Sequence, residues 1–168
     1  DRANHRVLYY PANRIDPGVA SVVFGQPDMS SRIQAVAPDR FFDPYSAAVS
    51  PAGNILYVTD FGANRVLRFN GSSSADQVYG QMGRFTTSTA NKGGVSGTSL
   101  SGPSSVALDA FGRLFVIDYF NNRILKFSGS TTATKSASTS TASRMSRCYP
   151  SHFAARFGAP SRGSTTTR

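Results

Sequence analysis

The sequence contains no glutamate and a single cysteine, Cys148, among its 168 residues. A disulfide within the chain and a cysteine-based zinc site are therefore both excluded. Histidine is equally scarce, since only His5 and His152 are present, so a zinc site built on three histidines is excluded as well. No apolar run approaches the roughly 20 residues that a membrane-spanning helix needs. These absences remove several common metal-binding and membrane classes of function.

Positive charge is plentiful but unevenly distributed along the chain. The formal net charge is +9; residues 1–127 hold 12 Lys and Arg against nine Asp, a balance of +3. Residues 128–168 hold six Lys and Arg and no acid, a balance of +6. Most of the basicity therefore lies outside the patterned part of the chain, whose charge fits an ordinary protein surface better than a phosphate-binding face.

One ten-residue pattern occurs three times and organises the chain. Its copies begin at Asp1, Asp60 and Asp118, so that successive starts are 59 and 58 residues apart. In each copy the Asp is followed five residues later by an Arg, then by an aliphatic pair and, two positions on, by an aromatic residue. Three copies at so even a spacing predict a repeat protein.

The repeated polar residues are interpreted as turn and packing residues. The carboxylate of each Asp can accept backbone N–H bonds from the turn that follows, and it can pair with the Arg. The residue before that Arg is His5 or an Asn, and Asn tolerates the left-handed conformation that a hairpin needs. The Asp and Arg residues could instead line a ligand site, but their recurrence in every unit favours the structural role. The structural set comprises Asp1, His5, Arg6, Asp60, Asn64, Arg65, Asp118, Asn122 and Arg123.

Each full unit also contains four short runs rich in Val, Ile, Leu, Phe and Tyr, separated by turn-forming residues. In the middle unit these runs are residues 46–50, 55–59, 65–69 and 77–79. No segment has a sustained helical period. Four short antiparallel strands per repeat predict an all-β fold, an incomplete β-propeller of roughly 2.5 four-stranded blades.

The blades are expected within residues 1–127. They comprise the third and fourth strands of one blade, one full blade at 44–81, and the first three strands of another at 103–127. Because Asp1 already lies inside a repeat, we expect a piece of a larger protein that needs further blades or another chain to close the ring.

Residues 128–168 form a segment with its own composition, with 18 Ser and Thr among 41 residues. We interpret it as a low-complexity, mostly disordered tail rich in Ser, Thr and Arg. A fourth strand for the last blade would begin close to Lys135, but no strand signal arrives there. A reading frame or gene model that departs from the ancestral one near Gly129 is the alternative.

Several of these elements resemble the NHL-repeat family of β-propellers. Asn4-His5-Arg6-Val7 stands where the family signature belongs, and residues 112–127 look like a second and third strand of the repeat. The recurring Phe-Gly-Gln element, at residues 24–26 and as Tyr-Gly-Gln at 79–81, looks like a longer-period variant found in large surface or secreted proteins. The resemblance implies a non-enzymatic module for protein or glycan binding or scaffolding, without cofactor or metal, at an extracellular or cell-surface location.

Two other function classes stay open. Some NHL propellers bind RNA through a basic face with aromatic residues, but here Asp28, Asp39 and Asp43 share a connector with two of the candidate cations. Propellers that resemble amidating lyases, lactonases or strictosidine synthases use metal ligands or a Glu, so an enzyme would need active-site blades absent from this chain. The candidate partner contacts lie in the connectors between blades and are Arg32, Arg40, Arg84, Phe85 and Lys92.

Two predictions concern single positions. Phe41 and Leu100 each stand three residues before a strand-opening Pro, and we expect both to be buried anchors beneath the connectors. Asn70 begins an Asn-Gly-Ser triplet that matches an N-glycosylation acceptor, although the same triplet is ordinary turn chemistry after a strand.

Overall fold

The computed structural model describes residues 1–11, 18–129, 131–133 and 135–138, which form three antiparallel sheets. The strands are β1 (Val7–Tyr9), β2 (Val22–Phe24), β3 (Pro44–Val49), β4 (Ile55–Asp60), β5 (Arg65–Asn70), β6 (Gln77–Tyr79), β7 (Pro103–Leu108), β8 (Leu114–Asp118), β9 (Arg123–Phe127) and β10 (Lys135–Ser138). Single 3-10 turns precede β1, β5 and β9, namely η1 (Arg2–Asn4), η2 (Phe61–Ala63) and η3 (Tyr119–Asn121). Within these residues no helix has the length and apolar character needed to cross a membrane.

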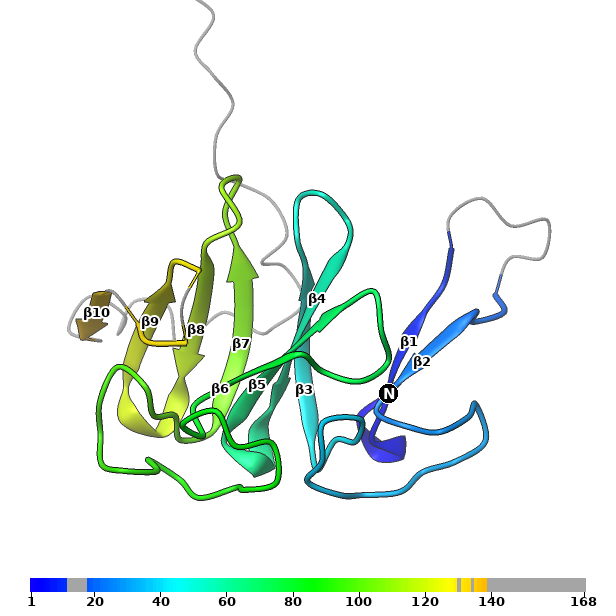
Figure 1. The fold of residues 1–168 in the computed structure, drawn as a ribbon, viewed down its shortest axis with the longest axis horizontal. Coiled ribbons are helices and arrows are strands. Elements are labelled where there is room, and N and C mark those ends of the chain that lie inside the picture. The colour runs from blue at the N-terminus through cyan, green and yellow to red at the C-terminus, as the bar shows by residue number, and fades with distance from the viewer. Residues whose placement is uncertain (12–17, 130, 134, 139–168) are drawn as a thin grey trace, which may run out of the picture.

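Each sheet is a meander in which strands adjacent in the sequence pair with one another. The orders are β1-β2, β3-β4-β5-β6 and β7-β8-β9-β10, and Figure 1 shows the three sheets standing side by side. The first strand of the third sheet, β7, packs against β3 and β4 of the middle sheet. Four-stranded meanders that follow one another and pack face to face are the blades of a β-propeller. In its described residues the chain is therefore an incomplete propeller with two strands of one blade and two four-stranded blades.

Alternation along the strands of the middle blade divides its side chains between two cores. Val58 on β4 points into the interface with the first sheet, where Phe24 of β2 also packs. Its neighbour Tyr57 points into the opposite interface, together with Val116 of β8. Successive residues of a strand face opposite sides, so an apolar run buried on both faces is what a central blade requires.

The rings in each core meet edge to face, the arrangement that aromatic quadrupoles favour. Phe69 lies 5.3 Å from Phe24 and 5.7 Å from Phe41, between ring centroids. In the other core Tyr79 lies 5.0 Å from Phe127. Phe41 and Leu100 are both fully buried, which confirms the prediction that they anchor the connectors.

The strands of the middle blade agree with the expected runs to within about two residues, and β6 agrees fully. The third blade differs from expectation, because β10 pairs antiparallel with β9 and supplies a fourth strand beginning at Lys135. The expectation of only three strands there, with the tail starting at residue 128, is wrong. A Lys-Ser-Ala-Ser strand carries no apolar signal, and backbone pairing with β9 is enough to form it. Residues 139–168 of the expected tail lie outside the described residues.

The two ends of the sheets differ in what they carry. One end holds the tight β3–β4 and β7–β8 turns, at the top of Figure 1, and the other holds η1, η2 and η3. The long connectors at residues 25–43 and 80–102 run along the same end as the 3-10 turns (Figure 1). We call this end, made of η1–η3 and the two connectors, the connector face.

Candidate functional site

The repeated Asp of the middle blade, Asp60, ends β4 beneath the connector face and is fully buried. Its carboxylate accepts the backbone N–H groups of Phe42 at 3.0 Å and Asp43 at 2.7 Å, and Arg65 Nε at 2.9 Å. The backbone donors belong to the preceding connector and not to the turn after Asp60, which corrects the expectation from the sequence. Burial raises the pKa of the Asp60 carboxyl, and the charge of Arg65 opposes that shift.

Arg65 continues this network on the other side of the carboxylate. Its guanidinium is fully buried and donates to the carbonyl oxygens of Ala37 at 3.2 Å and Arg40 at 2.9 Å. It also donates to the carbonyl of Phe85, in the following connector. Burial lowers the pKa of the Arg65 guanidinium against the pull of Asp60. Arg65 thus ties the connectors before and after its blade to Asp60. We call each repeated Asp–Arg pair, with the backbone groups bonded to it, a corner.

The other two copies repeat the Asp–Arg hydrogen bond, and the third also repeats the bond from the preceding connector. Arg123 Nε donates to Asp118 at 2.6 Å, and Ser101 of the preceding connector donates its N–H to the same carboxylate at 2.7 Å. Arg6 Nε donates to Asp1 at 2.7 Å. The Asp–Arg pairing predicted from the repeat is therefore present in all three copies, and its members are occupied in holding the fold.

The residue before each Arg adopts the predicted left-handed conformation. The φ angles are 51° at His5, 53° at Asn64 and 50° at Asn122. Asn64 does more than turn the chain, because its amide donates to Ser88 O at 2.9 Å and accepts the Gly102 N–H at 2.8 Å. Its side chain therefore joins the middle blade to the connector and the start of the third blade.

Two glutamines hold the connectors to the turns, and sequence reasoning gave them no role. Gln26 Nε2 donates to His5 O at 3.0 Å, and its Oε1 accepts the Ile33 N–H at 2.8 Å. Gln81 Nε2 donates to Asn64 O at 2.9 Å in the corresponding place. Both glutamines are buried. The recurrence of the Phe-Gly-Gln element was the available signal, because a Gln that recurs beside a turn can clamp it through backbone bonds.

The five candidate partner contacts fall into two groups. Arg40 pairs with Asp39 at 2.7 Å, and Phe85 packs against the core between the first two sheets. Arg32 and Arg84 are exposed and Lys92 is half-buried, and among the described residues the charged side chains of these three have no ion-pair or hydrogen-bond partner. They lie in two separate connectors of the connector face, so the structure does not gather them into one cluster. Partner contact by these cations stays a prediction.

The acidic residues of the described ranges are engaged within the fold. Seven Asp residues pair with an Arg: Asp1, Asp39, Asp43, Asp60, Asp76, Asp109 and Asp118. Asp28 accepts hydrogen bonds from Ser30 and Ser31, and these hold the pKa of its carboxyl at about 2. In the same ranges no three His, Cys, Asp or Glu side chains lie together as metal ligands would.

A row of aromatic side chains crosses the connector face, and sequence reasoning did not find it. Tyr45 lies 5.3 Å from Phe61, which lies 5.6 Å from Phe120 and 6.5 Å from Tyr119, between ring centroids. The guanidinium of Arg2 stands over the Tyr45 ring at 4.7 Å. We call Tyr45, Phe61, Tyr119 and Phe120 the aromatic strip.

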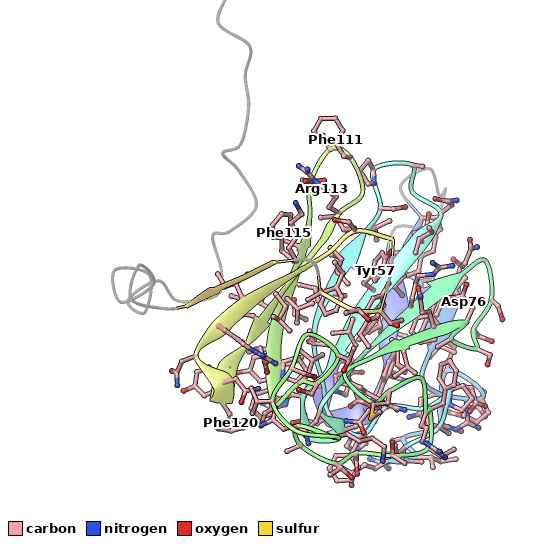
Figure 2. All side chains as sticks on the ribbon, turned by 60° about the vertical axis from the view of Figure 1, so that its left-hand side comes forward. Tyr57, Asp76, Phe111, Arg113, Phe115 and Phe120 are labelled. Carbon is pink, nitrogen blue, oxygen red and sulfur yellow. The ribbon has the colours of Figure 1, made fainter. Side chains whose placement is uncertain are left out.

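The signal for this strip was present in the repeat. The residue directly after the repeated Asp is Arg2 in the first copy, Phe61 in the second and Tyr119 in the third. Each of these opens a 3-10 turn at the connector face, and Figure 2 shows Phe120 at this end of the molecule, opposite Phe111. Three turns at the same height bring the side chains of three blades into one row.

No protein-family model and no curated protein sequence matches the chain. Among solved structures, it is similar to a catalytically inactive virginiamycin B lyase from Staphylococcus aureus with quinupristin, at 17% identity and a TM-score of 0.42, covering 72% of this chain and 31% of that one. It is also similar to a streptogramin B lyase, at 14% identity and a TM-score of 0.40, covering 70% of this chain and 30% of that one. A third similar structure is a candidate 6-phosphogluconolactonase from Bacteroides uniformis, at 20% identity and a TM-score of 0.41, covering 71% of this chain and 32% of that one.

This chain thus spans about a third of the length of each of those structures. Similarity at these identities and TM-scores does not indicate an activity. The propeller assignment rests on the order of strands in the sheets and on the packing of β7 against β3 and β4.

Proposed function

We propose that the chain is part of an NHL-type β-propeller module that binds a protein or glycan partner through its connector face and catalyses no reaction. The observation that carries the proposal is the aromatic strip. Tyr45, Tyr119 and Phe120 are exposed to solvent although they stand on structured turns and strands. Contiguous exposed aromatic side chains on a folded surface are typical of binding sites.

The repeat itself supports the NHL-type assignment. In each of its three copies an Asp, a residue in the left-handed conformation and an Arg follow at the same offsets. Their polar atoms bond connectors and turns, so the recurring residues serve the architecture. A recurring scaffold with variable residues at one end is how repeat proteins present a binding surface.

The proposal is tested by binding of the full chain to two kinds of ligand, a random dodecapeptide library displayed on phage and a glycan array. We expect one of the two to yield ligands whose affinity falls in Phe120→Ser and not in Phe111→Ser. Phe111 is the matched control because it is an aromatic residue, 83% exposed, at the opposite end of the third blade (Figure 2). Ligands that respond equally to both substitutions, or no ligand from either source, would contradict the connector face as the binding surface.

A further inference from the structure

The aromatic strip is continuous across two blades and reaches the first. Tyr45 belongs to the first strand of the middle blade and Phe61 to its 3-10 turn, whereas Tyr119 and Phe120 belong to the third blade. Arg2, from the first copy of the repeat, closes the row at the Tyr45 end. A ligand lying along the strip would therefore contact elements of three consecutive repeats at once.

The rings are held in place by close contact with glycine backbone. A Cβ atom at Gly102 would lie 2.5 Å from the Phe120 ring and 3.1 Å from the Phe61 ring. A Cβ atom at Gly62 would lie 2.6 Å from the ring of Phe42, which is also exposed at this face. Because these rings rest on backbone, ordering them costs little when a ligand binds.

The angles between the rings favour ligand side chains over flat ligands. Phe61 is inclined by 51° to Tyr119 and by 55° to Phe120, and Tyr119 and Phe120 are inclined by 72° to each other. Stacking of sugar rings or nucleobases uses ring faces presented one after another. Tyr45 is inclined by 31° to Phe61, and only Tyr119 and Phe120 meet edge to face, so the strip offers no series of parallel ring faces. Inclined rings present both edges and faces, against which aliphatic or aromatic side chains pack.

Charge decides what else the ligand carries. The described Asp carboxylates are all engaged, seven with Arg and Asp28 with serines, whereas the side chains of Arg32, Arg84 and Lys92 have no bonded partner in the described part of the chain. Lys92 follows Asn91, whose amide pairs with that of Asn121 beside Phe120, at 3.0 Å and 2.7 Å. Lys92 is therefore next to a residue that bonds η3 beside Phe120, and the two connectors of the same face carry further positive charge at Arg32 and Arg84. Positive charge on this face attracts an acidic partner.

We propose that the aromatic strip binds an acidic peptide segment of a partner protein, with leucine or aromatic side chains packed against the exposed surfaces of the rings and Asp or Glu residues facing the connector cations. This inference rests on the proposed function and names its ligand. A single-stranded RNA is the less suited acidic ligand, because Arg2, the cation on the strip itself, is held by Asp43 through two hydrogen bonds, one at 2.8 Å. A phosphate backbone needs free cations along its track.

The experiment compares the peptides that phage display selects on the full chain with those selected on two variants. We expect enrichment of peptides that combine Asp or Glu with Leu, Phe or Trp. The affinity of a synthetic copy should fall about tenfold or more in Phe120→Ser, as for loss of an aromatic anchor, and stay unchanged in Phe111→Ser. It should also fall in Arg32→Gln/Arg84→Gln and when salt is raised to about 0.5 M, where the Debye length is roughly 4 Å.

Each other outcome overturns the inference, and the outcomes separate it from the proposed function. If neutral or basic peptides, or a glycan, bound in a Phe120-dependent manner, the acidic-peptide inference would be wrong. The connector face would still be a binding surface. Binding of oligouridine without peptide binding, or no binding at all, would sink both. Because Phe120 is 60% exposed, its replacement by Ser should leave the midpoint of thermal unfolding nearly unchanged, so that a lost affinity is not a lost fold.

Discussion

The middle and third blades share one sequence pattern but differ in what covers them. Tyr57 of the middle blade is 7% exposed, because the third blade packs over it. Its counterpart three residues before the repeated Asp, Phe115, is only half-buried, and on the same face of β8 Ile117 is exposed. The Asp–Arg pair is likewise more deeply buried in the middle blade, since the side chain of Arg65 is fully buried and that of Arg123 is 12% exposed.

The difference teaches that a residue's contribution in this fold depends on the blade next to it as much as on its own strand. Equal residues in equal turns acquire unequal burial because only the middle blade has a described neighbour on both faces. Stability in repeat proteins is accordingly a sum of unit terms and interface terms. Paired substitutions at equivalent positions of the two blades measure the interface term directly.

The largest difference is expected at the corner. Asp60→Ala leaves the buried Arg65 guanidinium without its carboxylate, which should lower the free energy of unfolding by about 3–5 kcal/mol. Asp118→Ala should lower it by at least about 1 kcal/mol less, because Arg123 already reaches solvent and can be hydrated. Urea unfolding of the full chain followed by circular dichroism measures both.

A surface pair provides the reference for this comparison. Asp76 pairs with Arg68 at 2.7 Å in partly exposed surroundings, so Asp76→Ala should cost no more than about 1 kcal/mol. Equal losses for Asp60→Ala and Asp118→Ala would show that burial by the neighbouring blade does not set the strength of the corner.

The second comparison concerns apolar packing between blades. Tyr57→Ala removes a buried ring and should lower the free energy of unfolding by about 3 kcal/mol. Phe115→Ala should cost roughly half as much, because its ring is half-buried to begin with. The same unfolding measurement serves, and a Phe115→Ala loss as large as that of Tyr57→Ala would mean that the outer face of the third blade is more tightly packed than its exposure indicates.

The sequence predicted those parts of the structure that short-range chemistry determines. Strand positions, the left-handed turn at Asn64 and the Asp60–Arg65 pair follow from alternation and turn chemistry within a few residues. The parts it missed depend on distant partners. The Lys-Ser-Ala-Ser sequence of β10 becomes a strand only because β9 offers it an edge, and Tyr45 meets Phe61 only because the start of β3 and the turn η2 lie at the same end of the fold.

A third comparison separates backbone strain from hydrogen bonding at the turn. Asn64 and Asn122 share the left-handed conformation, but only Asn64 uses its side chain, for Ser88 and Gly102; that of Asn122 has no hydrogen bond among the described residues. Glycine adopts this conformation freely, so Asn122→Gly should change the free energy of unfolding by less than about 0.5 kcal/mol. Asn64→Gly should still cost about 1–2 kcal/mol through two lost hydrogen bonds.

Alanine provides the control for the turn, because it adds the cost of a Cβ in the left-handed region, about 1 kcal/mol, at both positions. The Gly and Ala variants are compared by denaturant unfolding. If Asn122→Gly destabilised the chain as much as Asn64→Gly, the hydrogen bonds of Asn64 to Ser88 and Gly102 would not account for the loss at Asn64.

The smallest expected effect distinguishes the two hairpins at the opposite end of the blades. In the third blade Asp109 accepts the N–H groups of Phe111 and Arg113, each at 3.0 Å, and in the middle blade Ser50 Oγ accepts the Ile55 N–H at 3.1 Å. Burial alone would raise the pKa of the Asp109 carboxyl, but the hydrogen bonds of Arg113 and Phe111 and the Arg113 charge outweigh it and hold the pKa below its ordinary value of 3.8.

Only the third-blade hairpin should therefore respond to acid. A carboxyl whose pKa is lowered by folding stabilises the folded state above pH 3.8, and this contribution is lost as the pH falls through the lower folded value. Amide hydrogen exchange should show protection of the Phe111 N–H decreasing over that range while protection of the Ile55 N–H stays constant. Asp109→Asn keeps an acceptor oxygen but cannot titrate, so the acid response should disappear in it; if the response persisted, the protons would be binding elsewhere and the hairpin difference would not arise from Asp109.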